Sequence, residues 1–129
     1  MKTILLVEDD PFLIDIYTTK LKEAGFKIEV ATDGEEGLRK LTASGPEGKK
    51  FDLVVLDIVL PQIDGWEILK KIKVDKKLKK IPVIILSNLG QKGEVEKGMK
   101  LGAVKYLIKA HYTPSEVVEE IKETLNLKP

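Results

Sequence analysis

The stretch that decides the fold is FDLVVLDIVLPQIDGWEI, residues 51–68. Its four apolar residues Leu53–Leu56 are typical of a strand that is buried on both faces. Asp57 follows this strand directly, and Pro61 and Gly65 then turn the chain into an expected helix. A carboxylate at the end of a buried strand is costly unless a cation or hydrogen-bond donors compensate its charge. The rest of the chain should therefore supply partners for Asp57.

The bulk composition excludes several classes of protein. The 129 residues suit one domain, residues 1–129, and 43% hydrophobic with 33% charged residues is typical of a globular protein. A net charge of +1 gives no bulk attraction to nucleic acid or to an anionic membrane. The absence of cysteine excludes disulfides, thiolate metal sites and a cysteine nucleophile. Three acids follow the apolar run Ile4–Val7, so this run predicts neither a signal peptide nor a membrane span. We expect a cytoplasmic protein.

Four apolar runs and one segment that alternates apolar and charged residues, Lys27–Ala31, are separated by helical patterns. The expected strands are Ile4–Val7, Lys27–Ala31, Leu53–Leu56, Val83–Leu86 and Val104–Ile108. The expected helices are Pro11–Ala24, Glu35–Thr42, Gly65–Val74, Gln91–Lys100 and Thr113–Leu125. This alternation predicts an α/β fold, a doubly wound (βα)₅ sandwich with right-handed crossovers around a parallel sheet. The first, third and fourth strands are the most apolar and should be central, which gives the strand order 2-1-3-4-5.

Two segments between or within these elements stand out. The segment Ala43–Lys50 contains two glycines and a proline, and we expect it to be a surface loop. The helix Gln91–Lys100 also contains two glycines, each of which costs about 1 kcal/mol relative to alanine. Val95 and Met99 are its expected apolar anchors. This helix should have the lowest local stability.

Acidic residues follow two of the expected central strands. Glu8, Asp9 and Asp10 come after the first strand, and Asp57 comes after the third. Because these strands are neighbours in the expected order, their ends meet where the order reverses, which is where ligands bind in such sheets. Unpaired carboxylates at one place would repel one another and raise each other's pKa. A hard divalent cation removes this repulsion, and an open, oxygen-rich site is typical of Mg²⁺.

A hydroxyl and an ammonium group complete the expected site. Ser87 ends the fourth strand, and Lys109 ends the fifth. Acids, a metal ion, a hydroxyl and an ammonium group around one carboxylate are the groups needed to handle a phosphoryl group. Asp10 is expected to be the N-cap of the helix that begins at Pro11, and to point away from the metal.

The chain resembles a response-regulator receiver domain (CheY-like) of two-component signalling. The resemblance covers essentially the whole chain and rests on LLVEDD at 5–10, VLDIVLPQIDG at 55–65, VIILS at 83–87 and YLIK at 106–109. Each motif is weak alone, but as an ordered set they are highly specific. The resemblance implies a flavodoxin-like fold and a protein that takes a phosphoryl group from a sensor histidine kinase or a histidine phosphotransfer protein.

The resemblance also implies a role for each residue of the expected site. Asp57 would be the phosphoacceptor. Asp9 would bind Mg²⁺ directly, Glu8 would act through a coordinated water, and Asp57 and the main-chain oxygen of Val59 would complete the metal site. Ser87 and Lys109 would contact the phosphoryl group. Tyr106 would be the switch residue, whose side chain turns inward on phosphorylation.

The same resemblance implies how the signal leaves the domain. The surface formed by the fourth helix, the fifth strand and the fifth helix would bind a downstream target protein or a second copy. The domain would be no enzyme beyond its own Mg²⁺-dependent phosphorylation and dephosphorylation. We expect no membrane contact and no direct binding of nucleic acid by this domain.

Each of these residues also has an ordinary structural interpretation. Asp9 or Asp57 could cap the helix that follows it. Ser87 could be a turn hydroxyl, and Lys109 a surface lysine. Tyr106 could be an edge-strand residue that packs on the last helix.

Three other functions remain open for the same sheet. A degenerate receiver would act only as a protein-binding adaptor. A flavodoxin-like cofactor binder needs a Gly-, Ser- or Thr-rich loop after the first strand, where Glu8, Asp9 and Asp10 would instead repel a phosphate. A phosphohydrolase with an aspartate nucleophile usually carries a partner acid two residues further on, where this chain has Val59.

The chain departs from the family pattern at two positions. Ala110 stands where proline is usual, so we expect either a trans Lys109–Ala110 peptide or a slightly different placement of Lys109 and the loop after the fifth strand. Asn88 stands where a small residue is usual and could narrow access to the acceptor. Val59 and Leu89 should line the approach of water, and both are apolar. We therefore expect slow dephosphorylation.

Seven lysines lie within residues 70–80, opposed only by Asp75. This run could be a nucleic-acid patch. It contains no aromatic residue, however, and lysine is favourable at a helix C-terminus, so a solvated helix end is the preferred interpretation. His111, the single histidine, is expected to be exposed.

Overall fold

The structure, a computed structural model, describes residues 2–43 and 51–126. Its strands are β1 (Thr3–Val7), β2 (Lys27–Ala31), β3 (Leu53–Leu56), β4 (Val83–Ser87) and β5 (Lys105–Ile108). Its helices are α1 (Pro11–Glu23), α2 (Gly34–Thr42), α3 (Gly65–Val74), α4 (Lys92–Lys100), α5 (Pro114–Thr124) and the short 3₁₀ helix η1 (Lys109–His111). The expected loop Ala43–Lys50 lies, apart from Ala43, outside the described residues.

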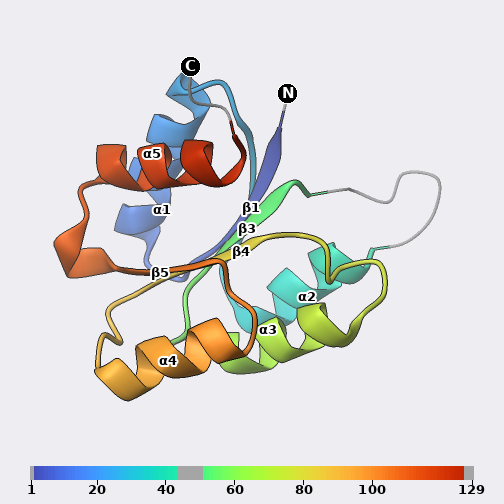
Figure 1. Cartoon of the computed structure of the whole chain (residues 1–129). Helices are drawn as coiled ribbons and strands as arrows, with labels where there is room; N and C mark the ends of the chain where they lie inside the picture. Colours follow the sequence, from blue (N-terminus) through green and yellow to red (C-terminus); the bar gives the residue numbers. More distant parts are fainter. Residues whose placement is uncertain (1, 44–50, 127–129) are drawn as a thin grey trace.

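The strands form one parallel sheet in the order β2-β1-β3-β4-β5, which confirms the expected order. Figure 1 shows α1 and α5 on one face of the sheet and α2, α3 and α4 on the other. This is the doubly wound α/β sandwich that the alternation of elements predicts. In the described part of the chain, no helix has the length and apolar character needed to cross a membrane.

The core has two layers because successive side chains of a strand point to opposite faces. On β1, Ile4 and Leu6 pack with α1 and α5, while Leu5 and Val7 pack with α2 and α3. All of β3 is at most 1% exposed. The continuous apolar run of this strand is therefore explained by burial on both sides.

The helix ends follow local capping chemistry. The Asp10 side chain accepts hydrogen bonds from the backbone N–H groups of Phe12 and Leu13, which confirms Asp10 as the N-cap of α1. Asp64 caps α3 in the same way, and Thr113 forms a capping box with Glu116 at the start of α5. These caps fix where each helix leaves the carboxyl edge of the sheet.

Helix α4 rests on the sheet through a glycine rather than through large apolar side chains. Gly98 is its buried residue, whereas Met99 is 45% exposed, so the expectation that Met99 anchors the helix is wrong. A Cβ atom on Gly98 would lie 2.7 Å from Ile85 Cδ1 and 2.8 Å from Tyr106 Cδ2. The close approach of the backbone takes the place of an anchor. The low local stability of α4 stays a prediction, which hydrogen exchange would measure.

The connection from β3 to α3 is drawn tightly against the end of the strand. The Gly65 N–H donates to the Ile58 carbonyl at 2.8 Å. A Cβ atom on Gly65 would lie 2.3 Å from the Asp57 carbonyl oxygen and 2.7 Å from Ile58 Cα. Since these neighbours are backbone atoms, they cannot move aside without shifting Asp57.

The Gly65→Ala substitution is therefore expected to lower the free energy of unfolding by about 2–3 kcal/mol, the cost of overpacking. Urea unfolding measures the change. The matched control is Gly93→Ala in α4, where an added Cβ meets nothing within 4 Å. This control should leave stability unchanged or raise it by up to about 1 kcal/mol. Equal effects of the two substitutions would contradict the close packing at Gly65.

Candidate functional site

A pocket of about 500 Å³ opens at the carboxyl edge of the sheet. Its lining residues are Glu8, Asp9, Asp10, Leu13, Asp57, Val59, Ser87, Asn88 and Lys109. The pairing of β1 with β3 brings the first acids together, because the Asp57 N–H donates to the Val7 carbonyl at 3.0 Å. The pocket lies at the reversal of strand order, as the sequence predicts.

Lys109 lies between two buried carboxylates. Its Nζ atom is 2.7 Å from Glu8 Oε1 and 2.7 Å from Asp57 Oδ2. Glu8 is 1% exposed and Asp57 is 6% exposed, so both charges are largely removed from water. The second oxygen of Asp57, Oδ1, accepts the Ile58 N–H at 2.7 Å. The surface-lysine interpretation of Lys109 is therefore wrong, because the structure brings Lys109 to Asp57.

Burial and ion pairing act in opposite directions on these groups. Burial raises the pKa of Glu8, although the hydrogen bonds from the Lys109 ammonium and the Asp10 N–H partly offset this rise. Burial alone would lower the pKa of Lys109, but the hydrogen bonds to Asp57 and Glu8 outweigh it and raise this pKa. Lys109 therefore stays charged at neutral pH.

Three carboxylates in the pocket could hold a metal ion. One oxygen each of Glu8, Asp9 and Asp57 lies within 4.8 Å of the others, and Asp9 is the exposed member of the group. All three supply hard oxygen ligands, which suit Mg²⁺ or Mn²⁺ better than softer metals. The open side of the pocket leaves room for water ligands. The donor set therefore fits the cation that the sequence predicts.

The Ser87 hydroxyl connects the pocket to Tyr106 through one residue. Ser87 is fully buried, and its Oγ accepts the Leu89 N–H at 3.3 Å. The Leu89 carbonyl in turn accepts a hydrogen bond from the Tyr106 hydroxyl. The Tyr106 ring packs beside Gly98 of α4, not on the last helix as the alternative interpretation proposed. The backbone of Leu89 is thus hydrogen-bonded to Ser87 through its N–H and to Tyr106 of β5 through its carbonyl.

Of the two apolar residues expected to line the approach of water to Asp57, Val59 lies in the pocket and Leu89 does not. Val59 is 62% exposed and lines the pocket, and Asn88 is exposed beside it. Leu89 is not among the lining residues, because its side chain packs against the core between the sheet and α2, α3 and α4. Any hindrance to water therefore rests on Val59 and Asn88.

Two residues at the site were not singled out from the sequence. Leu13 lines the pocket, and Tyr17 is buried one helical turn further along α1. Burial raises the pKa of the Tyr17 phenol, and the charges of Lys109, Glu8 and Asp57 also act on it. The spacing of four residues places both side chains on one face of α1, but spacing does not show that this face reaches the site.

The segment after β5 forms a regular turn although Ala110 replaces the usual proline. No peptide bond in the described ranges is cis, which confirms the trans Lys109–Ala110 peptide. Lys109–His111 forms a 3₁₀ turn, and His111 is exposed as expected. The Lys109 side chain reaches Asp57 from this turn.

Comparison with known proteins assigns the chain to a family. The model of the response regulator receiver domain matches residues 4–122. The alkaline phosphatase synthesis transcriptional regulatory protein PhoP of Bacillus subtilis is 33% identical over 124 residues, which are 96% of this chain and 48% of that protein. The chain belongs to the response regulator receiver domain family, as its motifs indicate. It spans about half the length of the curated relatives it matches.

Solved structures agree with this assignment. A CheY-like response regulator receiver domain protein of Methanospirillum hungatei has a TM-score of 0.85 and 29% identity, with 98% of this chain and 94% of that chain covered. The Mn²⁺-bound form of response regulator Rcp1 has a TM-score of 0.86 and 28% identity, with 97% of this chain and 94% of that chain covered.

Replacing Glu8 by glutamine is expected to stabilise the metal-free protein at neutral pH. Burial raises the pKa of Glu8, so the folded state binds a proton here more tightly than the unfolded state does. The stability of the wild type therefore falls as pH rises from the ordinary pKa of a glutamate to the raised pKa of the folded protein. Glutamine does not ionise, so the Glu8→Gln variant should not lose this part of its stability as pH rises.

Urea unfolding in the presence of a chelator, from acidic to neutral pH, measures this effect. The difference in stability between Glu8→Gln and the wild type should grow as pH rises. The control is Glu35→Gln, which changes an exposed glutamate outside the pocket. A difference for Glu8→Gln that does not change with pH would contradict the role of burial.

Proposed function

We propose that this chain is a phosphorylation-dependent signalling domain that accepts a phosphoryl group on Asp57 from a phosphohistidine of a sensor histidine kinase or a histidine phosphotransfer protein. The observation that carries the proposal is the setting of Asp57. One of its oxygens contacts Lys109, and two further carboxylates lie within 4.8 Å. A strand-end acid that only capped a helix would need neither partner.

The proposed cofactor is Mg²⁺, held by Asp9 and Asp57, by Glu8 through a water molecule, and by the main-chain oxygen of Val59. When bound, the ion would neutralise negative charge on the phosphoryl oxygens. Response regulator Rcp1, a structural relative of this chain, has been solved in an Mn²⁺-bound form, which supports a divalent cation here. The three carboxylates of this chain supply the oxygen ligands that such a cation prefers.

The protein's own groups have separate tasks in the proposed transfer. The Asp57 carboxylate attacks phosphorus while the histidine nitrogen leaves. Lys109 pairs with Asp57 before the transfer and with a phosphoryl oxygen afterwards, so its charge stays compensated. Ser87 donates its hydroxyl hydrogen to another phosphoryl oxygen. The pocket is open on one side, which gives a partner access to Asp57.

We propose that Tyr106 and α4 carry the signal to the surface. If the phosphoryl group draws Ser87 toward itself, the bond from Ser87 to the Leu89 N–H changes, and with it the carbonyl that Tyr106 contacts. The output surface would consist of α4, β5 and α5. Helix α4 suits a two-state element because its buried residue is a glycine.

The remaining expectations from the sequence stay part of the proposal. Residues 1–129 would form one receiver domain that resides in the cytoplasm. It would catalyse only its own phosphorylation and dephosphorylation, and its output would be a target protein or a second copy. The alternative is a degenerate receiver that acts only as a protein-binding adaptor.

Phosphodonor labelling separates these two functions. The wild type, incubated with acetyl phosphate and Mg²⁺, is expected to gain one phosphoryl group by mass spectrometry, and Asp57→Asn should lose labelling to background. The control is Asp64→Asn, an exposed N-cap where asparagine caps equally well. It should be labelled like the wild type. A wild type that takes up no phosphoryl group with Mg²⁺ would support the adaptor.

The aspartyl phosphate is expected to be long-lived, because Val59 offers no polar group that could orient water toward it. Decay is followed after the phosphodonor is removed. Val59→Asn and Asn88→Ala should each shorten the lifetime severalfold, the first by orienting water and the second by opening access. Val74→Asn, at an exposed valine outside the pocket, is the control. A wild-type half-life of seconds would sink this prediction.

A further inference from the structure

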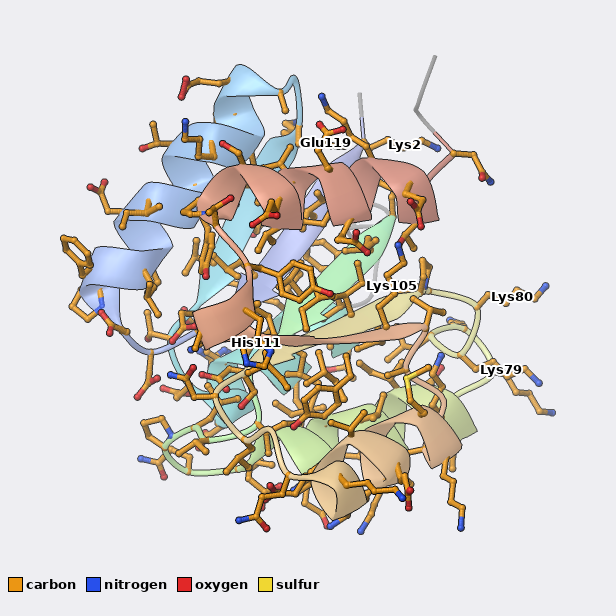
Figure 2. All side chains as sticks on the ribbon, turned by 60° about the vertical axis from the view of Figure 1, so that its left-hand side comes forward. Lys2, Lys79, Lys80, Lys105, His111 and Glu119 are labelled. Carbon is orange, nitrogen blue, oxygen red and sulfur yellow. The ribbon has the colours of Figure 1, made fainter. Side chains whose placement is uncertain are left out.

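The lysine run between α3 and β4 forms an exposed surface away from the pocket. Lys71, Lys76, Lys77, Lys79 and Lys80 are exposed, and with Val74 we call them the lysine surface. Lys76–Lys80 precede β4, whereas Ser87 ends it, so this surface lies at the opposite edge of the sheet from the pocket. Figure 2 shows Lys79 and Lys80 extending from this loop away from the ribbon.

The positive charge of this surface is not compensated within the described ranges 2–43 and 51–126. Lys70, just before it, pairs with Glu67 at 3.8 Å, but no ion pair is formed by the five lysines of the surface. Asp75, the acid within the run, is half-buried. Its Oδ1 accepts the N–H groups of Lys77 at 2.7 Å and Leu78 at 3.1 Å. Asp75 therefore acts as a turn cap rather than as a counter-ion for the lysines.

The surface is also held in shape. Leu78 and Ile81 pack against the core, the Lys79 N–H donates to the Asp75 carbonyl at 2.9 Å, and the Ile81 N–H donates to the Leu78 carbonyl at 2.9 Å. Binding to such a preformed segment costs little backbone entropy. Val74, at the end of α3, is 82% exposed and lies between Lys71 and Lys76 in the sequence. An exposed apolar side chain near polar ones can add an apolar contact to a protein–protein interface, whose rim is polar.

We propose that the lysine surface is a docking site for an acidic segment of a partner protein that also carries aliphatic side chains. The lysines would pair with its carboxylates, and Val74 would contact its aliphatic side chains. Because the surface is remote from Asp57, docking is independent of phosphorylation. It would raise the local concentration of a partner while the pocket stays open to it.

The same observations disfavour two other negatively charged partners, a nucleic acid and an anionic lipid bilayer. A nucleic acid would leave Val74 unused, and the surface has no aromatic side chain on which its bases could stack. A lipid bilayer would be entered by a continuous apolar face. Here Leu78 and Ile81 are committed to the core, which leaves Val74 alone.

Fluorescence anisotropy with a short labelled peptide that repeats Glu-Glu-Leu tests the proposal. Replacing Lys76, Lys77, Lys79 and Lys80 by glutamine should weaken binding by about tenfold or more, and added salt should weaken it further. Replacing Lys20, Lys22, Lys27 and Arg39 by glutamine removes the same net charge from exposed positions outside α4, β5 and α5 and should change binding by no more than about twofold. Circular dichroism checks that each variant is folded.

Three further measurements separate the proposal from simple charge attraction. Val74→Ser should weaken peptide binding about threefold, a Gln-Gln-Leu peptide should not bind, and Asp57→Asn should bind like the wild type. Equal losses in the two fourfold variants, or no effect of Val74→Ser, would overturn the proposal. It would also be overturned if duplex DNA or phosphatidylserine vesicles bound the lysine surface more tightly than the peptide.

Discussion

The contact of one ammonium group with two buried carboxylates governs the carboxyl edge of the sheet. Lys109 lies 2.7 Å from an oxygen of Glu8 and 2.7 Å from an oxygen of Asp57. Buried like charges are tolerated only when a counter-charge and hydrogen bonds compensate them. The three residues follow β1, β3 and β5, so their meeting requires the whole strand order. Burial raises the pKa of Glu8 despite this contact, which means that the acid pair is still costly.

A structural cost retained at a pocket is best explained by chemistry. The acids that make the edge unfavourable are the ones that could hold a divalent cation, and the ammonium group could follow a charge transferred to Asp57. From this pocket, contacts through Ser87, Leu89 and Tyr106 lead to a helix that rests on Gly98. Only Ser87, Leu89 and Tyr106 therefore lie between the proposed phosphorylation site and α4 of the proposed output surface. The lysine surface lies outside this connection, at the other edge of the sheet.

Most of the fold could be predicted because the signals are local. The runs Ile4–Val7 and Leu53–Leu56 are apolar at every position, and their short length favours strands covered on both faces. Asp10 is an N-cap that short-range hydrogen bonding identifies. Once the order 2-1-3-4-5 is inferred, the residues that follow β1, β3, β4 and β5 must converge at one edge. The positions of Asp57 and Lys109 follow from that geometry without any knowledge of side-chain packing.

The amino-acid sequence by itself determined the element order, the sheet topology, the helix caps and the set of charged residues around Asp57. Only the tertiary structure decided that Gly98 rather than Met99 seats α4, that Leu89 turns its side chain into the core while its backbone joins Ser87 to Tyr106, and that Val74 stays outside. The physical reason is that periodicity tells which face of an element turns inward. It does not tell how closely the neighbouring element approaches, and that distance decides which side chains and backbone groups meet.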